Sequence, residues 1–91
     1  MRTWRWTRQF KKDVKRQEKR GRRLEKLKVV TDLLIDGIAL PAAYLDHPLR
    51  GEYAGSRDCH IEPDWILIYT IQENGARVVF ERTGTHSDLL H

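Results

Sequence analysis

The sequence is poor in cysteine, with Cys59 alone among its 91 residues, so an internal disulfide is excluded and nothing points to an oxidising compartment. It also lacks any apolar run near the roughly 20 residues needed to cross a bilayer. No apolar stretch follows the basic residues at its start, so we expect no secretory signal and a cytoplasmic protein. With 40% hydrophobic and 33% charged residues, the composition predicts one globular domain over residues 1–91.

Lysine is absent after residue 28, and the charge of the chain is divided accordingly. Residues 1–28 carry thirteen Lys and Arg against three acidic residues, whereas residues 29–91 carry four Arg against ten acidic residues. Such a concentration of cations favours a polyanion as partner about as strongly as it favours a solvated helix face. The cations that we expect to contact phosphates are Lys11, Lys12, Lys15, Arg16, Lys19, Arg20, Arg22 and Arg23.

The basic third of the chain is predicted to form a short strand followed by two helices. Tryptophan alternates with arginine over residues 4–6, which is typical of a strand. Thr7 is suited to cap a helix over residues 8–20. Gly21 separates this helix from a second one over residues 22–36, and the two are expected to form a hairpin.

The second helix is the more apolar of the two. Val29, Val30 and Leu33 lie on several of its sides, which predicts that its C-terminal half is buried nearly all round. We expect Leu24, Leu27 and Leu34 to pack in the core together with Ile68 of the sheet. A stripe with three- and four-residue spacing is formed by Leu24, Leu27, Thr31, Leu34 and Ile38.

Strand signals dominate the rest of the chain. A loop with several Pro and Gly follows the helices, and a strand is expected around residues 56–61. Residues 65–72 form a continuous apolar run, typical of a central strand covered on both faces. Asn74 and Gly75 are a strong hairpin signal before a last strand over residues 77–83. This order predicts an α+β fold, β-α-α-β-β-β, with an antiparallel sheet, a helical hairpin on one face and the other face free for function.

Three histidines and one aspartate fall where these elements end: His47, His60, Asp64 and His86. Imidazole is the side chain that most readily gives and takes protons near pH 7. Metal-independent cleavage of RNA needs one group to deprotonate the 2′-OH and another to protonate the leaving 5′-oxygen. It also needs a cation or an N–H donor to stabilise the charged phosphorane. This set is suited to such chemistry, with Asp64 orienting an imidazole or transferring a proton itself.

Each of these residues also has an ordinary structural explanation. A single histidine is more often a surface or hydrogen-bonded residue than a catalyst, and Asp64 could simply shape a turn. Zinc ligation by His47, His60 and His86 with Cys59 is a further alternative. The spacing argues against it, because CxxC, HxxxH and HExxH motifs are missing and strand alternation directs Cys59 and His60 to opposite faces. We therefore expect no metal and no cofactor.

Three blocks of the sequence are specific enough to indicate a family. They are FKKDVK at residues 10–15, LPAAYLDHPLRGEYAGSRDCHIEPDWILIY at residues 40–69 and FERTGTH at residues 80–86. In these blocks the chain resembles the YafQ group of the RelE superfamily, which are ribosome-dependent mRNA endonuclease toxins of bacterial type II toxin–antitoxin modules. The resemblance implies the RelE-like microbial RNase fold, with a short C-terminal helix, and cleavage of mRNA in the ribosomal A site.

The resemblance also implies roles position by position. Functional residues of the family fall on His47, His60, Asp64 and His86, and it leaves open which histidine is base and which is acid. We favour His47 as base and His86 as acid, with His60 and Asp64 holding the phosphate and the hydrogen-bond network. The family has an aromatic residue at the position of Leu90, and a leucine cannot stack on a base in its place. Additional candidates for catalysis or positioning are Asp58, Arg82 and Leu90.

Two functions are thus open. The first is an endoribonuclease toxin that contacts ribosomal RNA through its basic hairpin, acts without a membrane, and is inhibited by a small DNA-binding antitoxin whose acidic segment crosses that hairpin. Operator DNA would then be bound only through the antitoxin complex. The alternative is a non-enzymatic RNA- or DNA-binding module that uses the basic hairpin alone, and such a module has no need of the histidine set. His91, at the chain end, is expected to be dispensable for either function.

Overall fold

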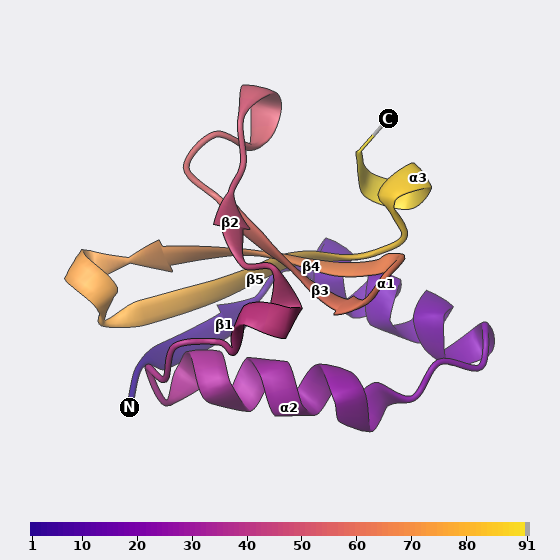
Figure 1. Ribbon diagram of the computed structural model, residues 1–91, viewed down its shortest axis with the longest axis horizontal. Helices are drawn as coiled ribbons and strands as arrows, with labels where there is room; N and C mark the ends of the chain where they lie inside the picture. The colour runs from indigo at the N-terminus through magenta and orange to yellow at the C-terminus, as the bar shows by residue number, and fades with distance from the viewer. Residues whose placement is uncertain (91) are drawn as a thin grey trace.

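The computed structural model describes residues 1–90 and contains a five-stranded sheet with helices on both faces (Figure 1). The predicted order of strands and helices is confirmed, and His91 lies outside the described residues. Within residues 1–90 no helix combines the length and apolarity that a membrane span requires. The elements are β1 (Thr3–Trp6), α1 (Arg8–Lys19), α2 (Leu24–Ile35), η1 (Ala42–Tyr44), β2 (His47–Pro48), η2 (Gly51–Tyr53), β3 (Arg57–Glu62), β4 (Trp65–Gln72), η3 (Glu73–Gly75), β5 (Arg77–Gly84) and α3 (His86–Leu89).

The strands lie in the order β1-β5-β4-β3-β2. The four strands β2 to β5 pair antiparallel, and the predicted β4–β5 hairpin is confirmed, with Tyr69 opposite Phe80. The expectation of a wholly antiparallel sheet is wrong at one edge, because β1 runs parallel to β5. Its direction is set by Thr7, which ends β1 and caps α1. The Thr7 backbone N–H donates to the carbonyl of Phe80 (3.1 Å), and its hydroxyl donates to the carbonyl of Glu81 (2.8 Å).

The main core lies between the sheet and the two helices α1 and α2. Trp65, Tyr69 and Phe80 are buried there, as are Leu27 and Leu34 of α2, which confirms these two positions of the predicted core. Leu24 is only partly buried, and the expectation for Ile68 is wrong, because it packs on the opposite face of the sheet. The expected burial on all sides is wrong, because α2 is the outer layer and its Val29 is 51% exposed. A glycine with positive φ follows the end of each helix, Gly21 (86°) after α1 and Gly37 (72°) after α2. Glycine adopts this left-handed conformation readily and commonly terminates helices.

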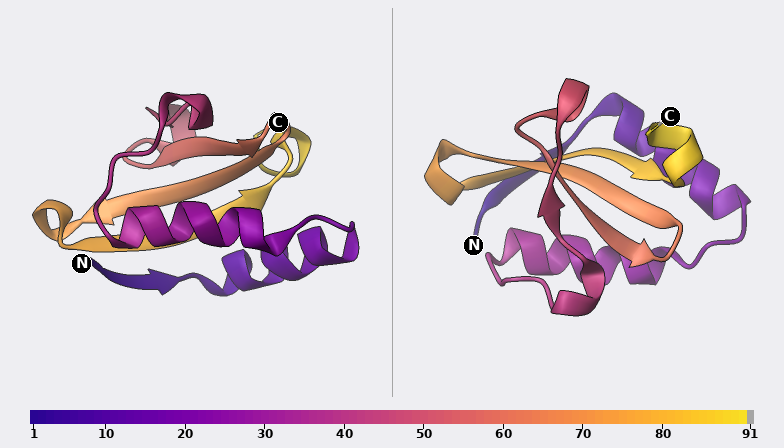
Figure 2. Two further views of the ribbon diagram at one scale, coloured as in Figure 1. Left: turned by 60° about the horizontal axis from the view of Figure 1, so that its bottom comes forward. Right: turned by 45° about the horizontal axis from the view of Figure 1, so that its top comes forward.

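A smaller cluster lies on the opposite face of the sheet. There Leu89 of α3 packs on Ile66 and Ile68 of β4, with Tyr53 and Leu90 beside them. Figures 1 and 2 show η2 and α3 on this side, across the sheet from α2. Ile66, Ile68 and Asp58 are buried on this face, while His60 and Arg82 remain partly exposed. The expectation that this face is available for function is consistent with these exposed side chains.

Candidate active site

The three predicted histidines lie in a row on the face of the sheet away from α1 and α2. His60 projects from β3, and His47 on β2 is the register partner of Asp58 on β3. The ring centroids of His47 and His60 are 6.3 Å apart, and those of His60 and His86 are 5.2 Å apart. Since strand residues two apart share a face, Asp58 and His60 lie on this face while Cys59 faces the helices.

His47 is held at both of its ring nitrogens. Nδ1 lies 2.7 Å from the carbonyl oxygen of Leu45, so this nitrogen carries a hydrogen and donates. Nε2 lies 3.1 Å from Oδ1 of Asp58. The two groups lie at ion-pair distance without a hydrogen bond between them, and protonation of the imidazole would make the contact an ion pair.

Asp58 lies beneath the histidines and is only 2% exposed. Burial raises the pKa of its carboxyl, and the positive charges that His47, His60 and His86 can carry oppose this rise. A carboxyl with a raised pKa is suited to take or release a proton beside His47.

The loop that carries His47 is anchored by its neighbour Asp46. The carboxylate of Asp46 accepts hydrogen bonds from Nε of Arg57 (3.2 Å) and from the hydroxyl of Tyr69. These bonds tie the loop to β3 and to β4. Burial and the adjacent Asp46 carboxylate raise the pKa of Tyr69, so the phenol remains a donor.

His86 is oriented by Asp64 from the β3–β4 turn. One oxygen of Asp64 accepts from the backbone N–H of His86 (3.0 Å) and from Nδ1 of its ring (2.8 Å). These two hydrogen bonds, the backbone one first, hold the pKa of Asp64 below its usual value. With Nδ1 occupied, Nε2 of His86 is the nitrogen left to exchange a proton with a substrate.

The short helix α3, which begins at His86, is fixed through Asp88. Asp88 and Thr85 form a capping box, and Nη1 of Arg20 at the end of α1 donates to Asp88 (2.6 Å). The chain passes so close here that a Cβ on Gly84 would lie 2.9 Å from Oδ2 of Asp88. A side chain at position 84 would therefore displace the Asp88 side chain from its capping position.

Arg82 supplies a cation on the same face, opposite Ile68 in the β4–β5 register. Its guanidinium donates to the buried Asp13 of α1, from Nε (2.7 Å) and from Nη2 (3.3 Å). Asp13 also accepts from the backbone N–H of Thr83 (3.1 Å). The Arg82 side chain keeps 25% of its surface exposed, so it is fixed in position and still accessible to an anion.

Two further predictions concern Cys59 and Leu90. Cys59 is fully buried on the helix face, where burial raises the pKa of its thiol to about 12, so it cannot join the histidines in a zinc site. Across residues 1–90 no three or more His, Cys, Asp or Glu are grouped so that they could hold a metal ion. Leu90 packs on the small cluster formed by Ile66, Ile68 and Leu89.

The chain matches the family model described as bacterial toxin of type II toxin–antitoxin system, YafQ, over residues 2–91. The chain belongs to the YafQ toxin family. It is 52% identical to the mRNA interferase toxin YafQ of Escherichia coli K12 over 83 residues, which cover 90% of this chain and 88% of that protein.

Solved structures of YafQ relatives agree with this membership. A chain in the crystal structure of the E. coli DinJ–YafQ complex superposes with a TM-score of 0.91 at 47% identity and full coverage of both chains. A metal-bound toxin from Helicobacter pylori superposes with a TM-score of 0.90 at 36% identity, covering 99% of this chain and 100% of that one.

In this YafQ-family chain, all the predicted catalytic and positioning residues except Leu90 contribute a polar group to one face of the sheet.

The basic residues predicted to bind RNA divide into two kinds. Arg16 and Arg20 lie near Asp88, Arg22 pairs with Glu62, and Arg23 lies 4.0 Å from Glu25. Among the described residues, no carboxylate partner is found for Lys11, Lys12, Lys15 and Lys19.

Sequence reasoning missed three aspartates that hold the site together: Asp13, Asp46 and Asp88. For Asp13 a signal existed. It is one of only three acidic residues among the first 28 and follows Phe10 by three positions, on the apolar side of a helix that is otherwise basic. An acid on a buried stripe needs a cationic or N–H partner, and Arg82 and Thr83 supply both.

Proposed function

We propose that this chain is the toxin of a type II toxin–antitoxin module, and that it cleaves mRNA in the ribosomal A site by metal-independent acid–base catalysis. The observation that carries the proposal is the row of three imidazoles beside a tethered arginine on one open face, in a member of the YafQ toxin family. A simple RNA-binding module would need none of this arrangement.

His47 is the general base of the proposed reaction. Its Nδ1 is committed to the Leu45 carbonyl, so Nε2 takes the proton of the 2′-OH. For this step the imidazole is neutral, and its Nε2 turns from the Asp58 carboxyl toward the substrate. The 2′-oxygen then forms a bond to the adjacent phosphorus atom.

His86 is the general acid. The Asp64 carboxylate on Nδ1 stabilises the imidazolium form, and Nε2 donates a proton to the 5′-oxygen as its bond to phosphorus breaks. The products are a 2′,3′-cyclic phosphate, or the 3′-phosphate formed from it by water, and a free 5′-OH. Arg82 and His60 stabilise the negative charge of the phosphorane between the two steps.

The basic hairpin gives this activity its two macromolecular partners. Unpaired lysines on α1 bind ribosomal RNA phosphates through charge, which places the mRNA against the histidines and confines the activity to the cytoplasm. An antitoxin, a small DNA-binding protein with an acidic segment, binds the same charged region and links the toxin to operator DNA only indirectly. The E. coli relative crystallised with DinJ supports a cognate antitoxin.

Primer extension on mRNA from cells that briefly express this chain tests the activity. We expect cuts within reading frames, in phase with codons, and only in translated messages. End-labelling of the fragments should show a free 5′-OH. A 5′-phosphate, which two-metal hydrolases commonly leave, would contradict the acid–base mechanism even if RNA were cut.

Metal analysis of the purified protein provides the companion measurement, because a relative has been crystallised with metal. We expect full cleavage activity after dialysis against EDTA. If activity is lost and returns only when a divalent metal ion is added, the proposed mechanism is wrong. The assignment of RNA as the substrate would still hold.

A further inference from the structure

A hollow of about 290 Å³ lies on the helix side of the molecule, between β1, α1 and α2, and the catalytic chemistry does not use it. Its floor is apolar, with Phe10, Phe80 and Leu27 at its base. Trp4 and Trp6 of β1 form one wall, and Leu24 and Ile35 of α2 contribute to the opposite wall.

The tryptophan wall is exposed to an unusual degree for residues of this size. Trp4 is 46% exposed and Trp6 42% exposed, and their ring centroids are only 4.7 Å apart, so they present a single apolar surface. They belong to an edge strand, since β1 pairs with β5 on one side and has no further strand among residues 1–90 on the other. Exposed, contiguous aromatic surface of this kind usually marks a docking site.

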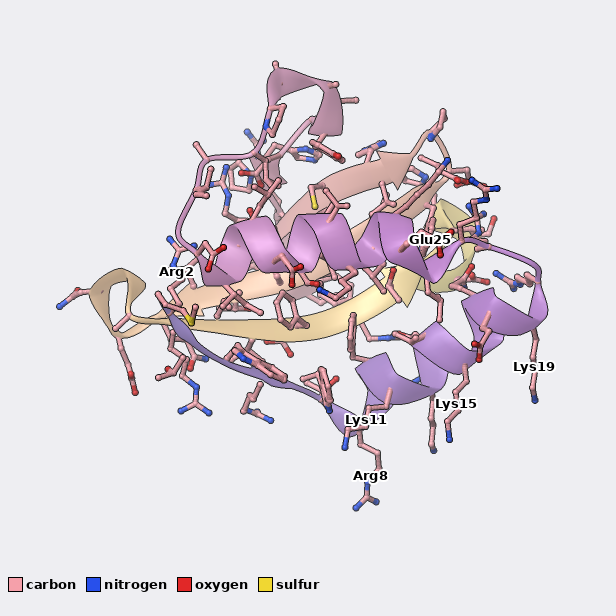
Figure 3. All side chains as sticks on the ribbon, turned by 90° about the horizontal axis from the view of Figure 1, so that it is seen from below. Arg2, Arg8, Lys11, Lys15, Lys19 and Glu25 are labelled. Carbon is pink, nitrogen blue, oxygen red and sulfur yellow. The ribbon has the colours of Figure 1, made fainter. Side chains whose placement is uncertain are left out.

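Cations border this hollow on the α1 side. Lys11 lies over the ring of Trp6, with Nζ 5.7 Å from its centroid. Figure 3 shows Arg8, Lys11 and Lys15 projecting from the outer side of α1, away from the sheet. No carboxylate within residues 1–90 neutralises them, so the apolar surface is edged by unpaired positive charge.

We propose that this hollow, lined by Trp4, Trp6, Phe10, Leu24, Leu27 and Ile35, is the anchoring site of the antitoxin. The occupant would be a segment of that protein whose apolar side chains alternate with Asp or Glu. Apolar burial against the tryptophans supplies affinity, and the acidic residues meet the α1 cations and speed association. This inference rests on the proposed toxin–antitoxin function.

Charge and position favour a protein over RNA in this place. The lining is mainly apolar, and its polar members on α2 are Lys28, Thr31 and Asp32. Lys28 and Asp32 pair with each other at 2.7 Å, which leaves few polar groups free to pair with a sugar–phosphate chain. Trp4 and Trp6 also lie across the sheet from the histidines, because their register partners Val78 and Phe80 face the helical core. An RNA strand seated against the histidines therefore does not extend over the tryptophans.

Binding to the purified antitoxin tests the site. The antitoxin is first identified as the small protein, encoded beside this chain, that restores growth when the two are co-expressed. We expect Trp4→Ala and Trp6→Ala each to raise the dissociation constant by at least about 30-fold, the change typical of an interface hot spot. Cleavage of mRNA should remain at the level of the unmodified chain.

Two matched controls exist on the same side of the molecule. Val29 and Ile38 are 51% and 53% exposed and lie outside the hollow, so Val29→Ala and Ile38→Ala should leave the dissociation constant within about twofold. If all four variants bind alike, the site is wrong although the toxin function stands. If no neighbouring protein restores growth, the partner itself is wrong.

Hydroxyl-radical footprinting of the unmodified protein keeps the test independent of whether the variants fold. Oxidation of Trp4 and Trp6, read by mass spectrometry, should fall in the antitoxin complex and stay unchanged with ribosomes. Protection by ribosomes instead would assign the hollow to RNA. Protection in the free protein that increases with its concentration would assign it to a second copy of this chain. Either result overturns the proposal.

Discussion

His47 and His86 differ in what each ring nitrogen contacts, and this difference supports the roles proposed for them. His47 donates from Nδ1 to a neutral carbonyl and directs Nε2 at a buried carboxyl. His86 donates from Nδ1 to the exposed carboxylate of Asp64, which leaves Nε2 free. The first arrangement favours a base, and the second favours an acid.

Removal of either imidazole should therefore reduce the rate without unfolding the protein. We expect His47→Ala and His86→Ala each to lose about 10²–10⁴ in cleavage rate, the range typical of one general acid or base. His60→Ala and Asp64→Ala should also be impaired. Single-turnover cleavage on programmed ribosomes measures the loss. His91→Ala is the control and should cleave at the normal rate. Normal rates for both His47 and His86 variants would contradict the assignment.

Asp58 should affect the pH dependence of the reaction more than the binding of RNA. Burial raises the pKa of the Asp58 carboxyl, which lies 3.1 Å from Nε2 of His47, so this group loses its proton above the usual range of a carboxyl. Asp58→Asn removes this titrating group, so the acidic limb of the pH–rate profile should shift to lower pH. Asp46→Asn, which perturbs the loop without touching the Nε2 atom of His47, should lower the rate with no such shift.

At the scale of single elements, α2 owes its place to one buried face. Leu34 is 4% exposed, whereas Val29 on the same helix is half-exposed. We expect Leu34→Ala to reduce the free energy of unfolding by about 2–5 kcal/mol, because it leaves a cavity in the core. Val29→Ala should change it by no more than about 0.5 kcal/mol. Urea denaturation followed by circular dichroism compares the two.

The short helix α3 should be sensitive to acid. Its Asp88 accepts hydrogen bonds from Arg20 and from Thr85, which hold the pKa of Asp88 well below its usual range. A carboxyl with a depressed pKa contributes stability above its unfolded pKa of about 3.9, and this contribution is lost as the pH falls toward the folded pKa. Arg20→Gln should therefore be less stable than the unmodified protein at pH 7, and the difference should narrow below about pH 4. Arg23→Gln, which removes only an exposed pair with Glu25, should show no such pH-dependent difference.

Element boundaries were largely predictable because local chemistry fixes them. The Thr7 cap, the Gly21 break and the apolar run of β4 each depend on neighbouring residues alone, and each lies where the sequence predicts. The parallel pairing of β1 with β5 was not predictable in this way, because it joins residues more than 70 positions apart. For the same reason Asp13 and Arg82, from α1 and β5, could be named singly but not paired.

At the scale of the whole molecule, the residues proposed for catalysis and those proposed for recognition lie on different faces of the sheet. The histidines and Arg82 occupy one face, while α1, with its lysines, and the tryptophan hollow lie on the other side. This separation allows the surface that binds partners to be changed without altering the reacting groups. We therefore expect some substitutions to weaken ribosome binding without slowing cleavage, and others to slow cleavage without weakening ribosome binding.

The lysines of α1 provide the clearest case of such a separation. Lys12, Lys15 and Lys19 have no carboxylate partner within residues 1–90, so their charge is available to phosphates. Lys28, by contrast, already pairs with Asp32 at 2.7 Å. Replacing the first three together by Gln should weaken ribosome binding and flatten its dependence on log salt concentration by about one unit per lost contact.

Lys28→Gln should change that slope little, because its ammonium group is already neutralised within the protein. Binding of fluorescently labelled protein to ribosomes at several salt concentrations measures both variants. Because the triple variant retains His47 and His86, its cleavage rate at saturating ribosome concentration should equal that of the unmodified protein. An unchanged slope in the triple variant would show that α1 faces solvent on the ribosome. A lower saturating rate would show that the two faces are not independent.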